Sequence, residues 1–203
     1  MTEVAPVGAE SPRWEPLTPE QVRDLLRDVN VRWYIAGGLA LDLFLGHQIR
    51  AHADIDIAVF RDDVEKVRAA LKGWEMFVAE NGTLTPWRDG ELPKSAHELW
   101  CRERGKDAWQ FELLVEERSG DRWTYRRDPD VGLRANDIGR TTSDGIPYLR
   151  PEIQLLYKSK DPRPADETDF LTVLPRLDPA QKAFLSAGIW TTAPRHRWLG
   201  RLG

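Results

Sequence analysis

A glycine pair followed by two alternating aspartates constrains this chain more than any other feature. Gly37-Gly38 closes an apolar segment, and Asp54 and Asp56 follow in the run ADIDIAVF. Side chains alternate between the faces of a β-strand, so both aspartates would share one face while the neighbouring isoleucines enter a core. Adjacent carboxylates repel, and a divalent cation, which prefers oxygen ligands, removes that repulsion. The spacing therefore predicts a metal-binding acidic pair.

The residues before this pair predict a phosphate site. Residues 31–36 are expected to form a short strand, and the helical spacing of Leu39, Leu43 and Phe44 predicts a helix that ends at Gly46. Backbone N–H groups of a glycine turn that opens a helix suit a phosphate group. A phosphate site combined with metal-binding carboxylates is what phosphoryl or nucleotidyl transfer requires.

The remaining pattern predicts an α+β protein. Further strands are expected at residues 54–60, 75–79, 83–87, 98–102, 109–115, 123–126 and 146–149, and further helices at residues 19–28, 62–72, 151–159, 166–174 and 179–187. This order favours a mixed-sheet domain over residues 18–149, followed by a small helical C-terminal region, residues 150–192, packed on it. Residues 1–17 and 193–203 show little periodicity and are expected to be loose termini.

A third carboxylate is the remaining requirement of a two-metal site. Glu112 alternates with Phe111 and Leu113 in the apolar run WQFELLV, where a charge is costly unless it is paired or functional. It is either a salt-bridged glutamate on an edge strand or a carboxylate that reaches the acidic pair from a neighbouring strand. Glu116 and Glu117 are weaker candidates, because they fall at the end of the expected strand.

Composition narrows the range of partners. The formal net charge is −4 and no basic stripe is present, which disfavours a nucleic-acid partner and suits a small cationic substrate. The single cysteine, Cys101, excludes an internal disulfide framework and a multi-thiolate metal site, and is expected to be a small buried apolar residue. No segment has the pattern of a signal peptide or a membrane span, so we expect a cytoplasmic protein.

Taken together, these residues resemble the nucleotidyltransferase superfamily with the DNA polymerase β-like fold. The local pattern is similar to that of aminoglycoside and lincosamide nucleotidyltransferases: a strand, a glycine pair, an apolar helix ending in Leu-Gly, then an Arg, a His and Asp-x-Asp. Here the pattern is AGGLALDLFLG, Arg50, His52 and DIDI. The pieces HELWCRE, FELLVEE, GIPYLRPEIQLLYKSKD and DETDF resemble the same group, so the resemblance spans about residues 31–175.

The resemblance implies a metal-dependent enzyme. It would move an NMP, expected to be AMP, from an NTP to a hydroxyl of a small aminoglycoside- or lincosamide-like acceptor. The sequence leaves open whether this activity confers antibiotic resistance. Asp54 and Asp56 would bind one or two Mg²⁺ ions, and Glu112 would be a further metal ligand or the general base. Related families often have Asp at this third position, and the longer Glu112 leaves its role open between the two.

On the nucleotide side, the resemblance implies roles for Gly37, Gly38 and Arg50. One of two lysines in YKSKD is also expected to meet the phosphates, although Lys158 and Lys160 do not share a helix face and the choice stays open. The ordinary alternative for a lysine at a helix end is an interaction with the helix dipole. Nearby charged residues are expected to form an ion-pair network that fixes this loop: Asp161, Arg163, Asp166 and Asp169.

Two alternative functions remain compatible with the pattern. One is a toxin-type nucleotidyltransferase that modifies tRNA or protein, although the missing basic surplus argues against tRNA. The other is a relative that binds nucleotide without transferring it, although the aspartate pair is intact. The sequence leaves open the acceptor, the preferred base and the choice between monomer and homodimer.

Overall fold

The computed structural model describes residues 5–6 and 12–203, and these form an α+β fold. Residues 1–4 and 7–11 belong to the N-terminal segment that was expected to be loose, and they lie outside the described residues. The chain folds into two compact units. The first unit comprises residues 1–35 and 52–116, and the second comprises residues 36–51 and 117–203. These units do not follow the expected division at residue 149, because each unit combines segments that are far apart in the sequence.

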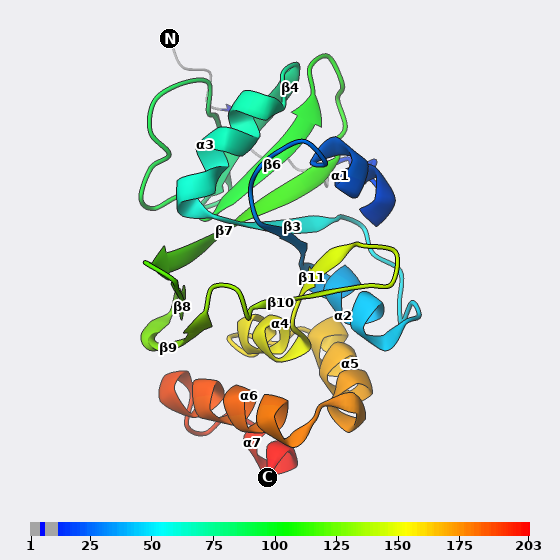
Figure 1. Ribbon diagram of the computed structural model, residues 1–203, viewed down its shortest axis with the longest axis vertical. Helices are drawn as coiled ribbons and strands as arrows, with labels where there is room; N and C mark the ends of the chain where they lie inside the picture. The colour runs from blue at the N-terminus through cyan, green and yellow to red at the C-terminus, as the bar shows by residue number, and fades with distance from the viewer. Residues whose placement is uncertain (1–4, 7–11) are drawn as a thin grey trace. The chain divides into compact units, whose positions relative to one another are not determined.

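The first unit is built on a mixed sheet. Its strands are β1 (Ala5–Pro6), β2 (Trp33–Ile35), β3 (Asp56–Phe60), β4 (Trp74–Glu80), β5 (Thr83–Pro86), β6 (Glu98–Glu103) and β7 (Phe111–Ser119), whose last residues enter the second unit. They are arranged in the order β1-β5-β4-β6-β7-β3-β2. Figure 1 labels β4, β6, β7 and β3 of this sheet. β3 and β7 are parallel, whereas the other neighbours in this order are antiparallel. The parallel pair therefore lies inside the sheet.

Two helices complete the first unit, α1 (Pro19–Leu25) and α3 (Arg61–Ala70). α3 begins at Arg61 with Phe60 as its N-cap, so the N-cap that the sequence indicates at Asp62 is wrong by two residues. The isoleucines beside the acidic pair, Ile55 and Ile57, are fully buried as predicted. On α3, Val64 and Val67 are also fully buried. Burial of these apolar side chains stabilises the packing of α3 and β3 in the first unit.

The second unit combines helices with short hairpins. Its helices are α2 (Gly37–Leu45), α4 (Pro151–Lys158), α5 (Pro164–Val173), a short 3₁₀ helix (Leu174–Arg176), α6 (Pro179–Thr192) and α7 (Leu199–Leu202). Its strands, besides the end of β7, are β8 (Arg122–Tyr125), β9 (Asp128–Arg134), β10 (Gly139–Thr141) and β11 (Pro147–Leu149). α4 is packed against α2, α5 and α6 (Figure 1).

Three features of the second unit differ from the expectation. α6 continues past Gly188, because the missing side chain lets it approach Leu156 of α4; a Cβ at Gly188 would lie 2.9 Å from the Cδ1 atom. β9 and β10 occupy segments that were expected to be turn and loop. The C-terminal residues are docked, since Trp198 is 1% exposed and its ring stacks on Phe170 at 4.1 Å.

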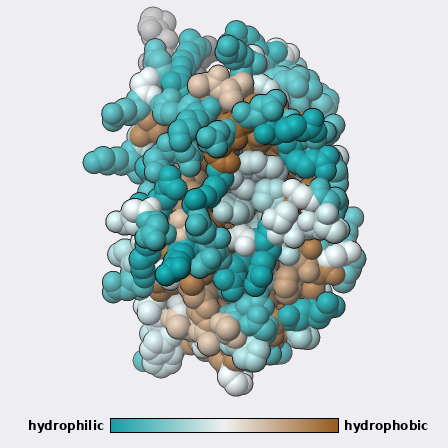
Figure 2. Space-filling model, in the orientation of Figure 1, coloured by the Kyte–Doolittle hydropathy of each residue, from teal (hydrophilic) through white to brown (hydrophobic). Residues whose placement is uncertain are grey.

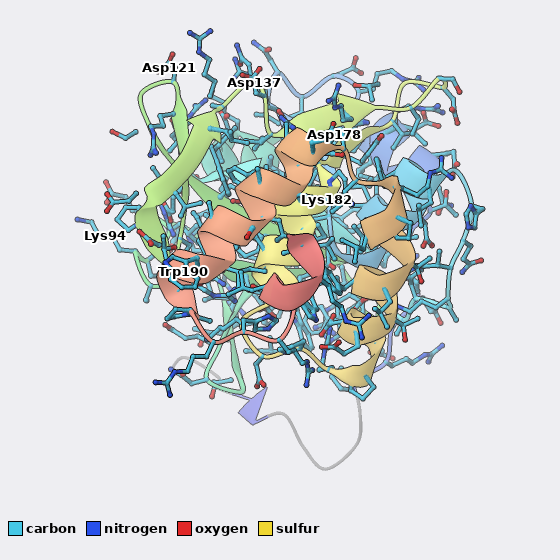
Figure 3. All side chains as sticks on the ribbon, turned by 90° about the horizontal axis from the view of Figure 1, so that it is seen from below. Lys94, Asp121, Asp137, Asp178, Lys182 and Trp190 are labelled. Atoms are coloured by element: carbon cyan, nitrogen blue, oxygen red, sulfur yellow. The ribbon has the colours of Figure 1, made fainter. Side chains whose placement is uncertain are left out.

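The surface is mainly polar. Figure 2 shows hydrophilic residues over much of one face, with smaller hydrophobic areas among them. Among the described residues, the large hydrophobic side chains that are exposed are Leu171 and Trp190. Trp190 and Lys182 lie on α6, and Asp178 is the N-cap of this helix (Figure 3). Across the part of the chain that the structure describes, no helix is long and apolar enough to cross a membrane.

Candidate active site

Two of the predicted carboxylates occupy paired positions on the two parallel strands of the first unit. Asp56 is the first residue of β3, and it is the register partner of Glu112 in β7. The backbone N–H of Glu112 donates to the carbonyl of Ile55 at 2.9 Å. Asp54 precedes the strand, which begins at Asp56 and not at residue 54 as expected. Adjacent parallel strands are about 4.8 Å apart, so this register brings the side chains of Asp56 and Glu112 close together.

Glu112 is buried in an acidic environment. Glu112 is 9% exposed. Because β7 lies between β6 and β3, the alternative of a glutamate on an edge strand is wrong. Burial, a hydrogen bond with Glu98 and the charges of Asp56, Glu98 and Asp54 raise the pKa of Glu112 to about 11. The carboxyl group is therefore neutral at pH 7 unless a cation compensates for its neighbours.

The donor set fits a hard divalent cation. Asp54, Asp56 and Glu112 offer carboxylate oxygens, which Mg²⁺ prefers, and their mutual repulsion is what a cation would relieve. Among the residues that the structure describes, no three acidic, histidine or cysteine side chains already stand in a metal-binding arrangement. Binding would thus require these carboxylates to converge through side-chain rotation.

Sequence reasoning missed Glu98, which extends the acidic group. Glu98 lies on β6, where its carboxylate accepts the indole N–H of Trp100 at 3.0 Å. Trp100 is the register partner of Glu112 across the antiparallel β6–β7 pair. The alternation of Glu98 and Trp100 in HELW was the sequence pattern that could have pointed to Glu98. The hydrogen bond between Glu98 and Glu112, however, depends on strand pairing that the sequence does not specify.

The predicted phosphate site lies in the second unit, at the start of α2. Gly37 is buried and adopts a left-handed conformation with φ of +63°. Its N–H is not available to a ligand, because it donates to Oε1 of Gln154 at 2.8 Å. The N–H groups of Gly38 and Leu39 have no hydrogen-bond partner within the described parts of the chain. α2 then ends at Gly46 as predicted, with φ of +77°.

Two of the basic residues implicated in nucleotide binding belong to a buried ion-pair network of the second unit. Arg50 donates from Nε and Nη2 to both carboxylate oxygens of Asp169, at 2.9 and 3.1 Å. Nζ of Lys158 lies 2.6 Å from Asp166 and 3.1 Å from Asp169. The side chain of Lys158 is 8% exposed, whereas Lys160 is exposed. The charges of Arg50 and Lys158 are thus already balanced by aspartates.

The network also fixes the start of α5. Asp166 accepts from the backbone N–H and from Nε of Arg163, both at 3.0 Å, in the first turn of the helix. Burial alone would raise the pKa of Asp166, but hydrogen bonds from Arg163 and Lys158 lower it to about 2. The expected ion-pair network is therefore confirmed for Arg163, Asp166 and Asp169. Asp166 is the third residue of α5, because the N-cap is Arg163 and not Asp166, as the sequence indicates.

Comparison with known proteins agrees with this fold. A family model described as aminoglycoside-2''-adenylyltransferase matches residues 20–91, which is about a third of the chain. Among curated protein sequences, none matches the chain significantly.

Several solved structures are similar to most of the chain. A crystal structure of ANT(2")-Ia in complex with adenylyl-2"-tobramycin has 15% identity and a TM-score of 0.53, over 86% of this chain and 96% of that one. The lincosamide antibiotic adenylyltransferase LnuA, bound to lincomycin, has 21% identity and a TM-score of 0.53, over 78% and 98% of the two chains. A solution structure of ANT(2'')-Ia has 14% identity and a TM-score of 0.55, over 86% and 91%.

The fold is that of the polymerase β-like nucleotidyltransferases, and the chain is related to that superfamily. The family model and the similar structures carry the names of antibiotic adenylyltransferases. The match over residues 20–91 includes the glycine pair and both aspartates, so it falls on the segment where the sequence resemblance is strongest.

Proposed function

We propose that the protein is a metal-dependent nucleotidyltransferase. It would transfer an NMP, with AMP as the expected one, from an NTP to a hydroxyl group of a small aminoglycoside- or lincosamide-like molecule. The observation that carries this proposal is the parallel register of Asp56 and Glu112, with Asp54 beside them, in the polymerase β-like fold. Three carboxylates held close together destabilise the fold because they repel one another. Such a cluster is therefore typical of a functional site that uses the negative charge.

The carboxylates would act through a bound cation. Asp54, Asp56 and Glu112 would hold one or two Mg²⁺ ions, which would offset negative charge on the reacting phosphate and on the leaving pyrophosphate. Glu112 must lose its proton before it can ligate a cation or accept a proton from the acceptor hydroxyl. Its neighbours Asp56 and Asp54 oppose that ionisation, so Glu112 would become reactive only when the charge of the site is compensated.

The second unit would bind the nucleotide phosphates. The N–H groups of Gly38 and Leu39 at the start of α2 are available donors, while Gly37 shapes the turn. Lys160 is the lysine of YKSKD whose charge is exposed and not paired within the described chain, so we assign the phosphate contact to it. Arg50 and Lys158 would support this unit through Asp169.

An amino-sugar or lincosamide acceptor agrees with the charge of the protein. The formal net charge is −4, and the half-buried carboxylates of Asp54 and Asp56 would attract ammonium groups. The solved structures with this fold include one with adenylyl-2"-tobramycin and one with lincomycin. The positive charge of a cationic acceptor would also offset part of the negative charge of the acidic residues.

An acceptor screen tests the proposal. The protein is incubated with Mg²⁺, each of four labelled NTPs, and a panel of aminoglycosides, lincosamides and bulk tRNA, and pyrophosphate release is measured. We expect release that depends on one antibiotic acceptor and is strongest with ATP. Release with tRNA alone would support the toxin-type alternative. No turnover with any acceptor, together with unchanged nucleotide affinity in Asp54→Asn, would contradict an enzymatic role of the carboxylates.

A further inference from the structure

A cavity of about 510 Å³ lies in the first unit, where α3 ends and β4 begins. Its volume is within the range of about 300–1,000 Å³ that is typical of small-molecule pockets. We call it the basic pocket, because four cationic side chains and two indole rings contribute to its lining: Arg68, Lys72, Arg88, Arg104, Trp74 and Trp87. All of its lining residues belong to the first unit.

The basic pocket is separate from the carboxylates of the candidate active site. Phe77 of β4 is the register partner of Trp100, which is the register partner of Glu112, so the three side chains share one face of the sheet. Side chains alternate along a strand, so Trp74 projects from the opposite face. Its ring lies against that of Phe111, the neighbour of Glu112 in β7, with 5.1 Å between the ring centres. The basic pocket is therefore a second site in the same unit.

Three cations of the basic pocket have no side-chain partner among the described residues. Lys72, Arg88 and Arg104 are exposed and make no ion pair or side-chain hydrogen bond there. The acidic residue of the lining, Glu75, is already paired with Nε of Arg102 at 3.2 Å. Like charges around one cavity repel one another, and an anion would offset that repulsion. The sign of this local charge is opposite to the net charge of −4.

The fourth cation and one indole form a fixed wall of the pocket. The guanidinium carbon of Arg68 lies 4.7 Å from the ring centre of Trp87, and Nη2 of Arg68 is paired with Glu65 at 2.7 Å. Nη1 of Arg68 donates to the backbone carbonyl of Arg88 at 2.6 Å. Trp87 is 7% exposed, whereas Trp74 is half-buried. A wall that is already ordered reduces the entropy cost of binding a ligand.

We propose that the basic pocket binds a small phosphorylated molecule with a flat aromatic ring, which is the chemistry of a nucleoside phosphate. Lys72, Arg88 and Arg104 would donate charge-assisted hydrogen bonds to the phosphate oxygens. The ring would stack on the half-buried indole of Trp74. A polynucleotide would require a basic surface that extends beyond one cavity, so a small ligand is favoured.

Calorimetric titration in the presence of a chelator tests this proposal. The full chain is titrated with ADP, with pyrophosphate and with adenosine, which together separate the contributions of the phosphate and the ring. The chelator removes the cation that the proposed reaction requires, so either proposal can fail without the other. The same titrations are made with Asp54→Asn, which changes the acidic residues and leaves the basic pocket intact.

Charge reversal supplies variants with matched controls. Lys72→Glu and Arg104→Glu reverse two of the unpaired cations of the pocket. Lys94→Glu and Arg126→Glu are the controls, because Lys94 (Figure 3) and Arg126 are exposed, lie outside the pocket and have no side-chain partner within the described chain. Thermal unfolding of all variants shows whether an effect on affinity follows from loss of folded protein.

We expect the wild-type protein to bind ADP without Mg²⁺, and pyrophosphate and adenosine about tenfold more weakly, because each lacks one part of the ligand. Lys72→Glu and Arg104→Glu should weaken ADP binding by about tenfold or more, whereas Asp54→Asn and both controls should retain wild-type affinity. No ADP binding, or ADP binding that neither reversal weakens, would overturn the assignment. Pyrophosphate that binds as tightly as ADP would contradict the ring contact. Binding of bulk tRNA in place of ADP, lost in the same reversals, would make these residues a nucleic-acid surface and also overturn it.

Discussion

Glu112 combines burial with negative neighbours, and this combination has consequences for stability as well as for catalysis. In the cation-free protein its pKa of about 11 means that the folded state keeps a proton that the unfolded chain loses above about pH 4.5. Above that pH the folded state binds more protons than the unfolded state, so this group makes the protein less stable as the pH rises. A residue that weakens the fold in this way is expected to be retained for its chemistry.

Replacement of Glu112 by glutamine tests this interpretation. Glu112→Gln keeps the shape and removes the ionisation, so in the presence of a chelator the variant should unfold at the same temperature as the wild type at about pH 3, below the pKa of the unfolded chain, and at a higher temperature at about pH 9. Nucleotidyl transfer should fall by about 100-fold or more, since a metal ligand or base is lost. Differential scanning calorimetry at several pH values measures the stability, and pyrophosphate release measures the activity. Equal unfolding temperatures at pH 9 would contradict the raised pKa.

Asp166 makes the opposite contribution at acid pH. Its pKa of about 2 is below the ordinary value of 3.8, so the stabilisation it supplies is complete above about pH 4 and is lost as the pH falls towards 2. Asp166→Asn should therefore be destabilised by about 1–3 kcal/mol at pH 7, because Lys158 and Arg163 lose a charged partner. The difference from the wild type should shrink as the pH falls from 4 to 2. Urea unfolding curves at each pH provide the measurement, and a difference that is constant with pH would contradict the ion-pair explanation.

At the level of secondary-structure elements, the sequence predicted those elements whose signals are local. The alternation around Asp56 predicted β3, and the glycine placed after Leu45 predicted the end of α2. The features that sequence reasoning missed depend on contacts between distant segments. Gln154 meets Gly37 across 117 residues, and Gly188 continues a helix because Leu156 of α4 packs against it. A glycine in isolation indicates a helix end, and only the packing of α4 shows that this one permits a close contact.

The glycine that opens α2 can be tested against the glycine that closes it. Gly37 and Gly46 both have a left-handed backbone, with φ of +63° and +77°, so alanine at either position should cost about 1–2 kcal/mol of stability. Only Gly37→Ala should also weaken nucleotide binding, because it disturbs the turn held by Gln154. Chemical unfolding and nucleotide titration of both variants check the prediction. A similar loss of nucleotide affinity in Gly46→Ala would show that the effect is a general consequence of destabilisation.

The contact between α4 and α6 gives a second prediction at this scale. Gly188→Ala places a Cβ 2.9 Å from both terminal methyl groups of the buried Leu156, and the resulting strain of about 1–3 kcal/mol should exceed the helix-propensity gain of about 1 kcal/mol. Gly200→Ala in α7 is the matched control, because no atom lies within 4 Å of the added Cβ. Unfolding free energies should therefore fall for Gly188→Ala and stay equal or rise for Gly200→Ala. A stabilised Gly188→Ala variant would contradict the close packing.

At the level of the whole molecule, the residues that the sequence singles out fall in two compact units, which are considered separately. The carboxylates Asp54, Asp56 and Glu112 belong to the first unit, and the glycine turn with Gln154 belongs to the second. Composition could not reveal this division, because each unit is assembled from two separate segments and the change at residue 149 is only a change from strands to helices. The superfamily relation was accessible from the sequence because the glycine pair and the aspartate pair lie close together along the chain.

Mass spectrometry of the acceptor after reaction tests the central claim most directly. The protein is incubated with ATP, Mg²⁺ and the acceptor selected by the screen, and the same reaction is run with Asp56→Asn. We expect an acceptor whose mass increases by one AMP moiety, one pyrophosphate released for each product molecule, and no product with Asp56→Asn or with a chelator. Product formation that persists in Asp56→Asn, or an acceptor that gains a phosphate from the γ position of ATP, would contradict metal-dependent nucleotidyl transfer by these carboxylates.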